Sequence, residues 1–228
     1  MNLLAIETST EACSVALYHA GATIARSELA PRRHAELVLP MADALLAEAG
    51  LRRRQLDAIA VGRGPGAFTG VRLAVSLAQG MALGLDLPVI PVSSLAALAF
   101  DAPDNGAPVL AAIDARMGEI YAASYRRDAQ GALRLIADEC VCAPGALRLP
   151  EAAAWNVIGS GWKVYRDVLA AQTGAPLWSD GERYPQAHAV AALAAIEFDA
   201  GRALPPERAL PIYLRDKVAL TLVEQRAR

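Results

Sequence analysis

Acidic, hydroxyl-bearing and glycine residues recur at the turns that follow predicted strands. The stretch Glu7-Thr8-Ser9-Thr10 ends the first predicted strand, and Asp114 opens a similar turn later in the chain. Carboxylates and hydroxyls at such turns can hold a phosphate and its magnesium ion. Gly159 and Gly161 could let an adenosine lie against exposed backbone. Ordinary hairpin turns use the same residue types. The candidate nucleotide site, active or vestigial, therefore contains Glu7, Thr8, Asp114, Gly159 and Gly161.

The most distinctive stretch is GRGPGAFTGVR, from Gly62 to Arg72, between a predicted buried strand and a predicted helix. Its glycines allow close backbone approach and positive φ, and free amides at the helix start could hold an anion. Arg63 and Arg72 would add positive charge to such a site. The stretch is not a P-loop, because no Lys-Ser/Thr pair follows the glycines at the required spacing. Two interpretations stay open: an anion site, or a loop that only shapes a tight turn.

Histidines and cysteines argue against metal and hydrolase chemistry. The three histidines form no HxxxH or HExxH pair, which a zinc peptidase would need. Cys140 and Cys142 lack zinc-ligand spacing, and no second cysteine pair exists to complete a site. The chain also has no GxSxG elbow for a serine nucleophile. We expect no metal site, and a peptidase is the weakest of the functional alternatives.

The composition is that of a folded globular protein. Of 228 residues, 54% are hydrophobic and 20% charged, and the formal net charge is -2. Binding nucleic acid alone would need clustered Lys and Arg, whereas the runs at 32–33 and 52–54 fit solvated helix ends. No leader-like segment precedes the first strand, and we expect no apolar run long enough for a bilayer. The expected location is the cytoplasm, without membrane association.

Periodicity and turn residues predict the same order of elements twice. Before the turn-rich linker at 101–108, we predict strands at 3–8, 13–18, 22–29, 56–61 and 89–92, and helices at 35–49, 68–85 and 93–100. After it, we predict strands at 109–114, 119–125, 133–142 and 155–158, and helices at 162–172 and 187–201. Pro40 should kink the first helix or reset its start. The order indicates a mixed-sheet α/β protein built of two similar halves.

Two such halves are typical of the actin-like ATPase (ASKHA) architecture, in which nucleotide binds between tandem ribonuclease-H-like halves. We predict halves at 1–102 and 107–228, with the last helix able to pack back on the first half. One function that this architecture allows is an ATP-dependent phosphotransferase or ATPase. It would use Glu7, Thr8, Asp114 and the turn Gly159-Ser160-Gly161.

The two long helices of the first half have more apolar surface than one sheet requires. Polar positions are few in the helix at 35–49. In the next helix, Gly70, Ala74, Ala78 and Ala82 recur every four residues and form a ridge of small side chains. A helix on a sheet needs only one apolar stripe. The surplus predicts a second helix pair packed on these two, unless the second half of the chain covers them.

Taken together, these motifs make the chain resemble the TsaB (YeaZ) family. The stretches that carry the resemblance span nearly the whole chain in order: LAIETST at 4–10, GRGPGAFTGVR at 62–72, PVSSL at 91–95, DARMGEIY at 114–121 and PIYLR at 211–215. Glu7 is a small departure, since Asp is common there in the family, but either acid fits the turn. The resemblance implies tandem actin-like halves related to the catalytic subunit TsaD.

The resemblance also implies a function without catalytic residues in this chain. TsaD transfers threonylcarbamoyl to N6 of the tRNA adenosine beside the anticodon, using a metal-binding histidine pair that this chain lacks. Members of the TsaB family act as scaffold and activator by docking on TsaD through the two first-half helices, in a four-helix bundle. The ATPase TsaE joins the assembly, tRNA is contacted only through the complex, and the same helices form a homodimer when TsaD is absent. No cofactor of its own is implied, although ATP or ADP at the partner interface is allowed. The predicted interface residues are His34, Leu37, Val38, Met41, Val71, Val75, Ala78 and Ala82.

Overall fold

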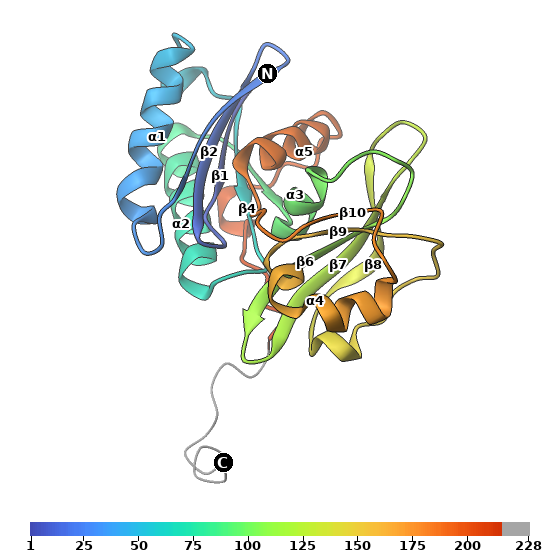
Figure 1. Ribbon diagram of the computed structural model, residues 1–228. Helices are drawn as coiled ribbons and strands as arrows, with labels where there is room; N and C mark the ends of the chain where they lie inside the picture. The colour runs from blue at the N-terminus through green and yellow to red at the C-terminus, as the bar shows by residue number, and fades with distance from the viewer. Residues whose placement is uncertain (216–228) are drawn as a thin grey trace, which may run out of the picture.

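The computed structural model describes residues 1–215, so the end of the predicted second half, 216–228, lies outside the described residues. The first sheet has the strand order β3-β2-β1-β4-β5, and its first three strands are antiparallel neighbours (Figure 1). β4 and β5 run parallel to β1. The strands are β1 (Asn2–Glu7), β2 (Ala12–His19), β3 (Ala22–Leu29), β4 (Ala58–Gly62) and β5 (Val89–Val92).

The second sheet repeats this topology, with the order β8-β7-β6-β9-β10. β6, β7 and β8 form an antiparallel meander, and β9 and β10 continue the sheet in parallel with β6. The strands are β6 (Val109–Arg116), β7 (Glu119–Arg127), β8 (Leu133–Cys142), β9 (Asn156–Ile158) and β10 (Trp178–Asp180). The matching orders confirm the predicted tandem ribonuclease-H-like halves.

The helices cover the sheets in layers, as Figure 1 shows: α1 and α2, the first sheet, α3 and α5, the second sheet, and then α4. The helices are α1 (His34–Glu48), α2 (Phe68–Leu85), α3 (Ser94–Phe100), α4 (Ser160–Thr173) and α5 (Ala187–Asp199). Short 3-10 turns lie at Arg53–Gln55, Pro144–Ala146 and Pro206–Arg208. Both faces of the first sheet are covered, so its central strands are apolar almost throughout.

Alternation along β1 shows how one strand serves two cores. Leu4 and Ile6 pack with α1 and α2, whereas Leu3 and Ala5 pack with α5 on the other face. Successive side chains of a strand point to opposite faces. Ser93 is the N-cap of α3, one residue before the helix begins, and its hydroxyl accepts a hydrogen bond from the amide of Ala96 at 3.1 Å.

Three details differ from the expectations. α1 runs from His34 to Glu48 without a new start at Pro40, so the expected reset is wrong. Pro40 lies on an exposed part of the helix, where water can satisfy the Glu36 carbonyl that loses its amide partner. β10 was not predicted, because its three residues, Trp178–Asp180, include two polar ones and form no apolar run. α5 packs against the first sheet although it follows the second in sequence, and the division at 1–102 and 107–228 stays a prediction.

By length and composition, α2 is apolar enough to cross a membrane, with a mean hydropathy of 1.3 over its 18 residues. This corrects the expectation that no apolar run reaches such a length. The core helix of a folded domain passes the same test, and α2 packs along β4 and β1 in this structure. One such helix is therefore weak evidence for a membrane span.

Candidate functional site

The carboxylate of Glu7 is enclosed where β1, β4 and α3 meet. The side chain is fully buried, Oε1 accepts a hydrogen bond from the Ser9 amide at 2.6 Å, and Oε2 accepts one from Ser94 Oγ at 2.7 Å. Burial raises the pKa of Glu7, although these hydrogen bonds act in the opposite direction. Glu7 therefore faces the core and cannot present its carboxylate to a phosphate or to magnesium.

Thr8 is also used in packing. Its hydroxyl donates a hydrogen bond to the Gly70 carbonyl at 2.7 Å, which joins the end of β1 to the first turn of α2. A side chain at Gly70 would overlap with the Thr8 carbonyl oxygen. The glycine at this position is thus explained by close backbone approach, as the architectural interpretation of the glycine-rich stretch requires.

Arg63 lies away from the start of α2. Its guanidinium pairs with Glu139 on β8 at 3.5 Å, and the Glu139 side chain is only 12% exposed. This ion pair links the two halves of the chain. The expectation that Arg63 adds charge to an anion site at the helix start is therefore wrong, because Arg63 compensates a nearly buried carboxylate elsewhere.

The candidate residues of the second half also have local partners. Asp114 accepts hydrogen bonds from Arg116 Nη1 at 2.9 Å and from the Tyr165 hydroxyl at 3.3 Å. Side chains at Gly159 or Gly161 would overlap with Ala112, since α4 begins close to β6. The expected nucleotide site does not assemble: Arg72 and Asp114 line one pocket, whereas Glu7, Thr8, Arg63, Gly159 and Gly161 do not.

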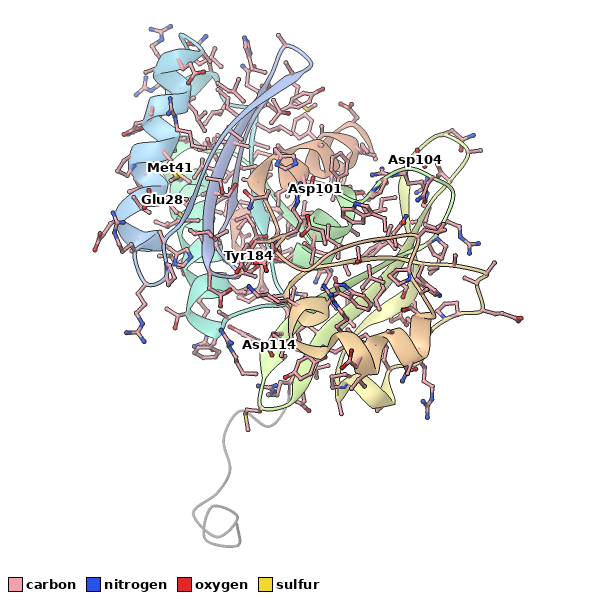
Figure 2. The ribbon with its side chains drawn as sticks, in the orientation of Figure 1. Glu28, Met41, Asp101, Asp104, Asp114 and Tyr184 are labelled. Atoms are coloured by element: carbon pink, nitrogen blue, oxygen red, sulfur yellow. The ribbon has the colours of Figure 1, made fainter. Side chains whose placement is uncertain are left out.

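The pocket that contains Arg72 and Asp114 lies between the two halves and has a volume of about 920 Å³. Its walls are the β1–β2 turn, the residues that lead into α1, the first turns of α2, the β6–β7 turn and residues 212–215. In Figure 2, Asp114 lies near the end of the second sheet that approaches α2. We call this space the inter-half pocket.

The predicted partner-interface residues fall into two groups. Three of them lie on α1 and are partly exposed: His34, Leu37 and Met41. Figure 2 labels Met41. Their role at a partner interface stays a prediction. The other five are at most 3% exposed and line the core under α1 and α2, so they cannot contact a docked protein: Val38, Val71, Val75, Ala78 and Ala82. This part of the prediction is wrong, because the small-residue ridge of α2 faces the sheet.

The exposed face of the helix pair contains residues that the sequence reasoning missed. Leu39 on α1 is 44% exposed, and Leu83 on α2 is 67% exposed. A second ridge of small residues, at Ser76, Gly80 and Gly84, lies on the exposed side of α2. These positions are the helical complement of the buried stripe. We call this surface the outer α1–α2 face.

Comparisons with known proteins agree with this fold. A family model described as "TsaD: tRNA N6-adenosine threonylcarbamoyltransferase" matches residues 24–219. The tRNA threonylcarbamoyladenosine biosynthesis protein TsaB of Escherichia coli (strain K12) is 44% identical, over 96% of each chain. The protein of the same name from Haemophilus influenzae is 41% identical, over 96% of this chain and 95% of that one. The solved structure of YeaZ from Pseudomonas aeruginosa has a TM-score of 0.87 and 44% identity, over 93% of this chain and 99% of that one.

The repeated strand order and the matching family model define the class: a protein of tandem ribonuclease-H-like halves related to the threonylcarbamoyltransferases. Within that class, the near full-length relatives at 41% to 44% identity are decisive. The chain belongs to the TsaB (YeaZ) family, which confirms the resemblance found in its motifs.

Proposed function

We propose that this chain acts in the biosynthesis of threonylcarbamoyladenosine in tRNA as a non-catalytic subunit. The pathway is the one for which its TsaB relatives are named. In this proposal the chain docks on a threonylcarbamoyltransferase, TsaD, and activates it as a scaffold. It would work in the cytoplasm, where tRNA is modified, and would contact tRNA only through the complex.

The observation that carries the proposal is the outer α1–α2 face. Leu39 and Leu83 are large apolar side chains that remain exposed on the two helices, where a protein partner could bury them. Ser76, Gly80 and Gly84 leave the backbone of α2 open to close approach. The face therefore suits a second pair of helices, in four-helix packing.

The nature of the partner follows from the shared fold. The catalytic family matches this chain across both halves, so a threonylcarbamoyltransferase should carry a comparable helix pair. A second copy of this chain offers the same face, so the proposal includes a homodimer when the catalytic subunit is absent. Recruitment of the ATPase TsaE, and binding of ATP or ADP at the partner interface, are further parts of the proposal.

Replacing Leu83 by Arg tests the docking face. We expect Leu83→Arg to weaken binding to the threonylcarbamoyltransferase of the same organism at least about tenfold, because it places a charge in an apolar contact. The matched control is Val164→Arg on α4, where Val164 is 53% exposed in another layer of the molecule. Titration calorimetry measures both affinities, and equal affinities of the two variants would contradict the proposed face.

Reconstituted tRNA modification tests the role itself. We expect the threonylcarbamoyltransferase to need this chain for full activity, and the isolated chain to hydrolyse no ATP in the presence of magnesium. The candidate phosphotransferase residues do not converge on one pocket, since Glu7 and Thr8 have buried partners and only Asp114 lines the inter-half pocket, which supports the accessory role. Full modification activity without this chain would exclude the activator function, and ATP turnover by the isolated chain would exclude its non-catalytic status.

A further inference from the structure

Cys140 and Cys142 lie close together at the end of β8. One residue separates them, and successive side chains of a strand point to opposite faces, so the two thiols share one face of the second sheet. Both side chains pack against the apolar cluster under α4, which includes Ile120 and Trp155. Both residues are also partly exposed. The chain therefore presents two neighbouring thiols to solvent at this edge of the sheet.

The two thiols interact with each other. Burial, and then the charge and a hydrogen bond of the Cys140 thiol, raise the pKa of Cys142 to about 11, and the charge of Glu119 adds to the shift. Cys142 is therefore almost entirely protonated at neutral pH, and a protonated thiol is a poor nucleophile. A reaction of this pair with an electrophilic sulfur atom should begin at Cys140.

The spacing of the two cysteines suits a strained disulfide. Two steps along a strand separate their Cα atoms by about 6.6 Å. Bridged cysteines have Cα atoms about 4.4–6.8 Å apart, and most often about 5.5–6 Å apart. Closing the bridge must therefore shorten the end of β8. Strained disulfides are the labile ones, which form and break most readily.

The end of β8 is able to bend. β8 is an edge strand of the second sheet, so within residues 1–215 it pairs with β7 alone (Figure 1). The pairing is irregular directly before Cys140, because Ala122 pairs with Cys140 whereas Ser124 pairs with Ala137. The extra residue of β8 at this bulge bends and twists the strand. Bringing the two sulfur atoms together should therefore cost less here than in a regular central strand.

We propose that Cys140 and Cys142 are a reversible thiol–disulfide pair, which takes low-molecular-weight disulfides as its oxidant. The Cys140 thiolate attacks one sulfur of the small disulfide, which forms a mixed disulfide and releases one small thiol. Cys142 then gives up its proton and attacks the Cys140 sulfur, which closes the internal disulfide and releases the second small thiol. The chain loses two electrons and two protons, and the small disulfide gains them. The pair goes beyond the proposed docking function, since it requires neither the partner nor the outer α1–α2 face.

Oxidation of the pair should strain the junction of the two halves. Glu139 directly precedes Cys140, and its carboxylate pairs with Arg63 of the first half at 3.5 Å. Val141, between the two cysteines, pairs with Tyr121, which lines the inter-half pocket. A three-residue loop restricts the unfolded chain less than a long loop does, so strain in the folded chain should outweigh that gain and lower the melting temperature of the oxidised chain. An unchanged or higher melting temperature after complete oxidation would contradict the strained bridge.

Incubation of the reduced full chain with oxidised glutathione at neutral pH tests the proposal. Mass spectrometry of the intact chain should show the loss of two hydrogen atoms without bound glutathione, and digestion should place that loss in the peptide that contains Cys140 and Cys142. Cys13 should keep its free thiol, because it is fully buried in the core of the first half. Added dithiothreitol should restore the original mass. A chain that stays reduced in excess oxidised glutathione, or that ends with glutathione bound to both cysteines, overturns the proposal.

Single substitutions identify the role of each thiol. Cys142→Ser should stop at the mixed disulfide, with one glutathione bound at Cys140, because the thiol that would release it is absent. Cys140→Ser should react with oxidised glutathione about tenfold more slowly than Cys142→Ser, since burial keeps the pKa of Cys142 raised. The matched control is Cys13→Ala, which should form the internal disulfide as the unmodified chain does. Absence of a glutathione adduct in Cys142→Ser, or equal reaction rates of the two serine variants, overturns the assigned order of attack.

Discussion

Gly62 lies directly against the carboxylate of Glu7, and a methyl group at position 62 would overlap with Glu7 Oε2. The two residues end neighbouring parallel strands, β4 and β1. Ser94, at the start of α3, donates to the same carboxylate oxygen. Glu7 therefore joins three elements of the first half through a buried contact that only glycine at position 62 permits.

Substitution of Gly62 by alanine should destabilise the protein. The added methyl group must displace a buried carboxylate that two hydrogen bonds hold in place, and overpacking of this kind costs about 1–3 kcal/mol in the free energy of unfolding. Urea denaturation measures the loss. The control is Gly80→Ala, where no atom lies within 4 Å of the new methyl group. That change should stabilise α2 by about 0.5–1 kcal/mol, and destabilisation by both changes would contradict the argument.

Replacement of Glu7 by glutamine should change how stability depends on pH. Burial raises the pKa of Glu7 above its ordinary value of 4.5, so the folded chain retains a proton that the unfolded chain releases. Stability is therefore lost as pH rises from 4.5 toward the folded pKa. In Glu7→Gln no charge forms, so the melting temperature should fall less over this range than in the unmodified chain. If the melting temperatures of the two proteins changed with pH in the same way, Glu7 would not be the group that causes the loss of stability.

A charge introduced on α2 should strongly destabilise the protein on the buried face of the helix and hardly change its stability on the exposed face. Ala78→Arg places a guanidinium in the core between α2 and the first sheet, and should cost more than about 4 kcal/mol of unfolding free energy. Leu83→Arg, on the exposed face, should change stability by less than about 0.5 kcal/mol. Circular dichroism melting curves compare the two variants. A native-like melting temperature in Ala78→Arg would show that the two faces of α2 have been assigned the wrong way round.

The sheets and helices were largely predictable because local pattern determines them. The glycine-rich loop followed by an apolar stretch gave the helix Phe68–Leu85 with its observed bounds, and turn residues separated β6 from β7. The face that α2 buries was not predictable. The helix is apolar nearly all round, and the small residues Gly70, Ala74, Ala78 and Ala82 suit a sheet and a helix partner equally well. Only the position of the sheet decides between them.

The candidate site was less predictable than the fold, because convergence of side chains is a property of the folded chain. Glu7 and Arg63 have residue types suited to phosphate chemistry, yet each is held by a partner distant in sequence, Ser94 and Glu139 respectively. Thr10 belongs to a predicted turn and His34 was predicted at the partner interface, but only the folded chain shows that their buried side-chain atoms lack hydrogen-bond partners among the described residues. A sequence pattern can indicate which polar side chains could bind a ligand. It does not show which of them already form hydrogen bonds or ion pairs in the folded chain.

The contact between His188 and Asp101 should make stability depend on pH near neutrality. His188 Nε2 lies 2.8 Å from Asp101 Oδ1, and Figure 2 labels Asp101, which follows α3. This hydrogen bond raises the pKa of His188 above 6.5, although burial and Arg183 act against it. The stabilisation is fully present below 6.5 and is lost as pH rises through the folded pKa.

His188→Gln removes this contribution and should lower the melting temperature more at about pH 6 than at about pH 9. The effect should stay below about 1 kcal/mol, because the His188 side chain is 40% exposed and solvent screens the pair. Asp101→Asn should reproduce the loss at low pH, since it removes the charge that holds the proton on the imidazole. If the difference in melting temperature between His188→Gln and the unmodified chain were the same at both pH values, the contact would not depend on a charged histidine.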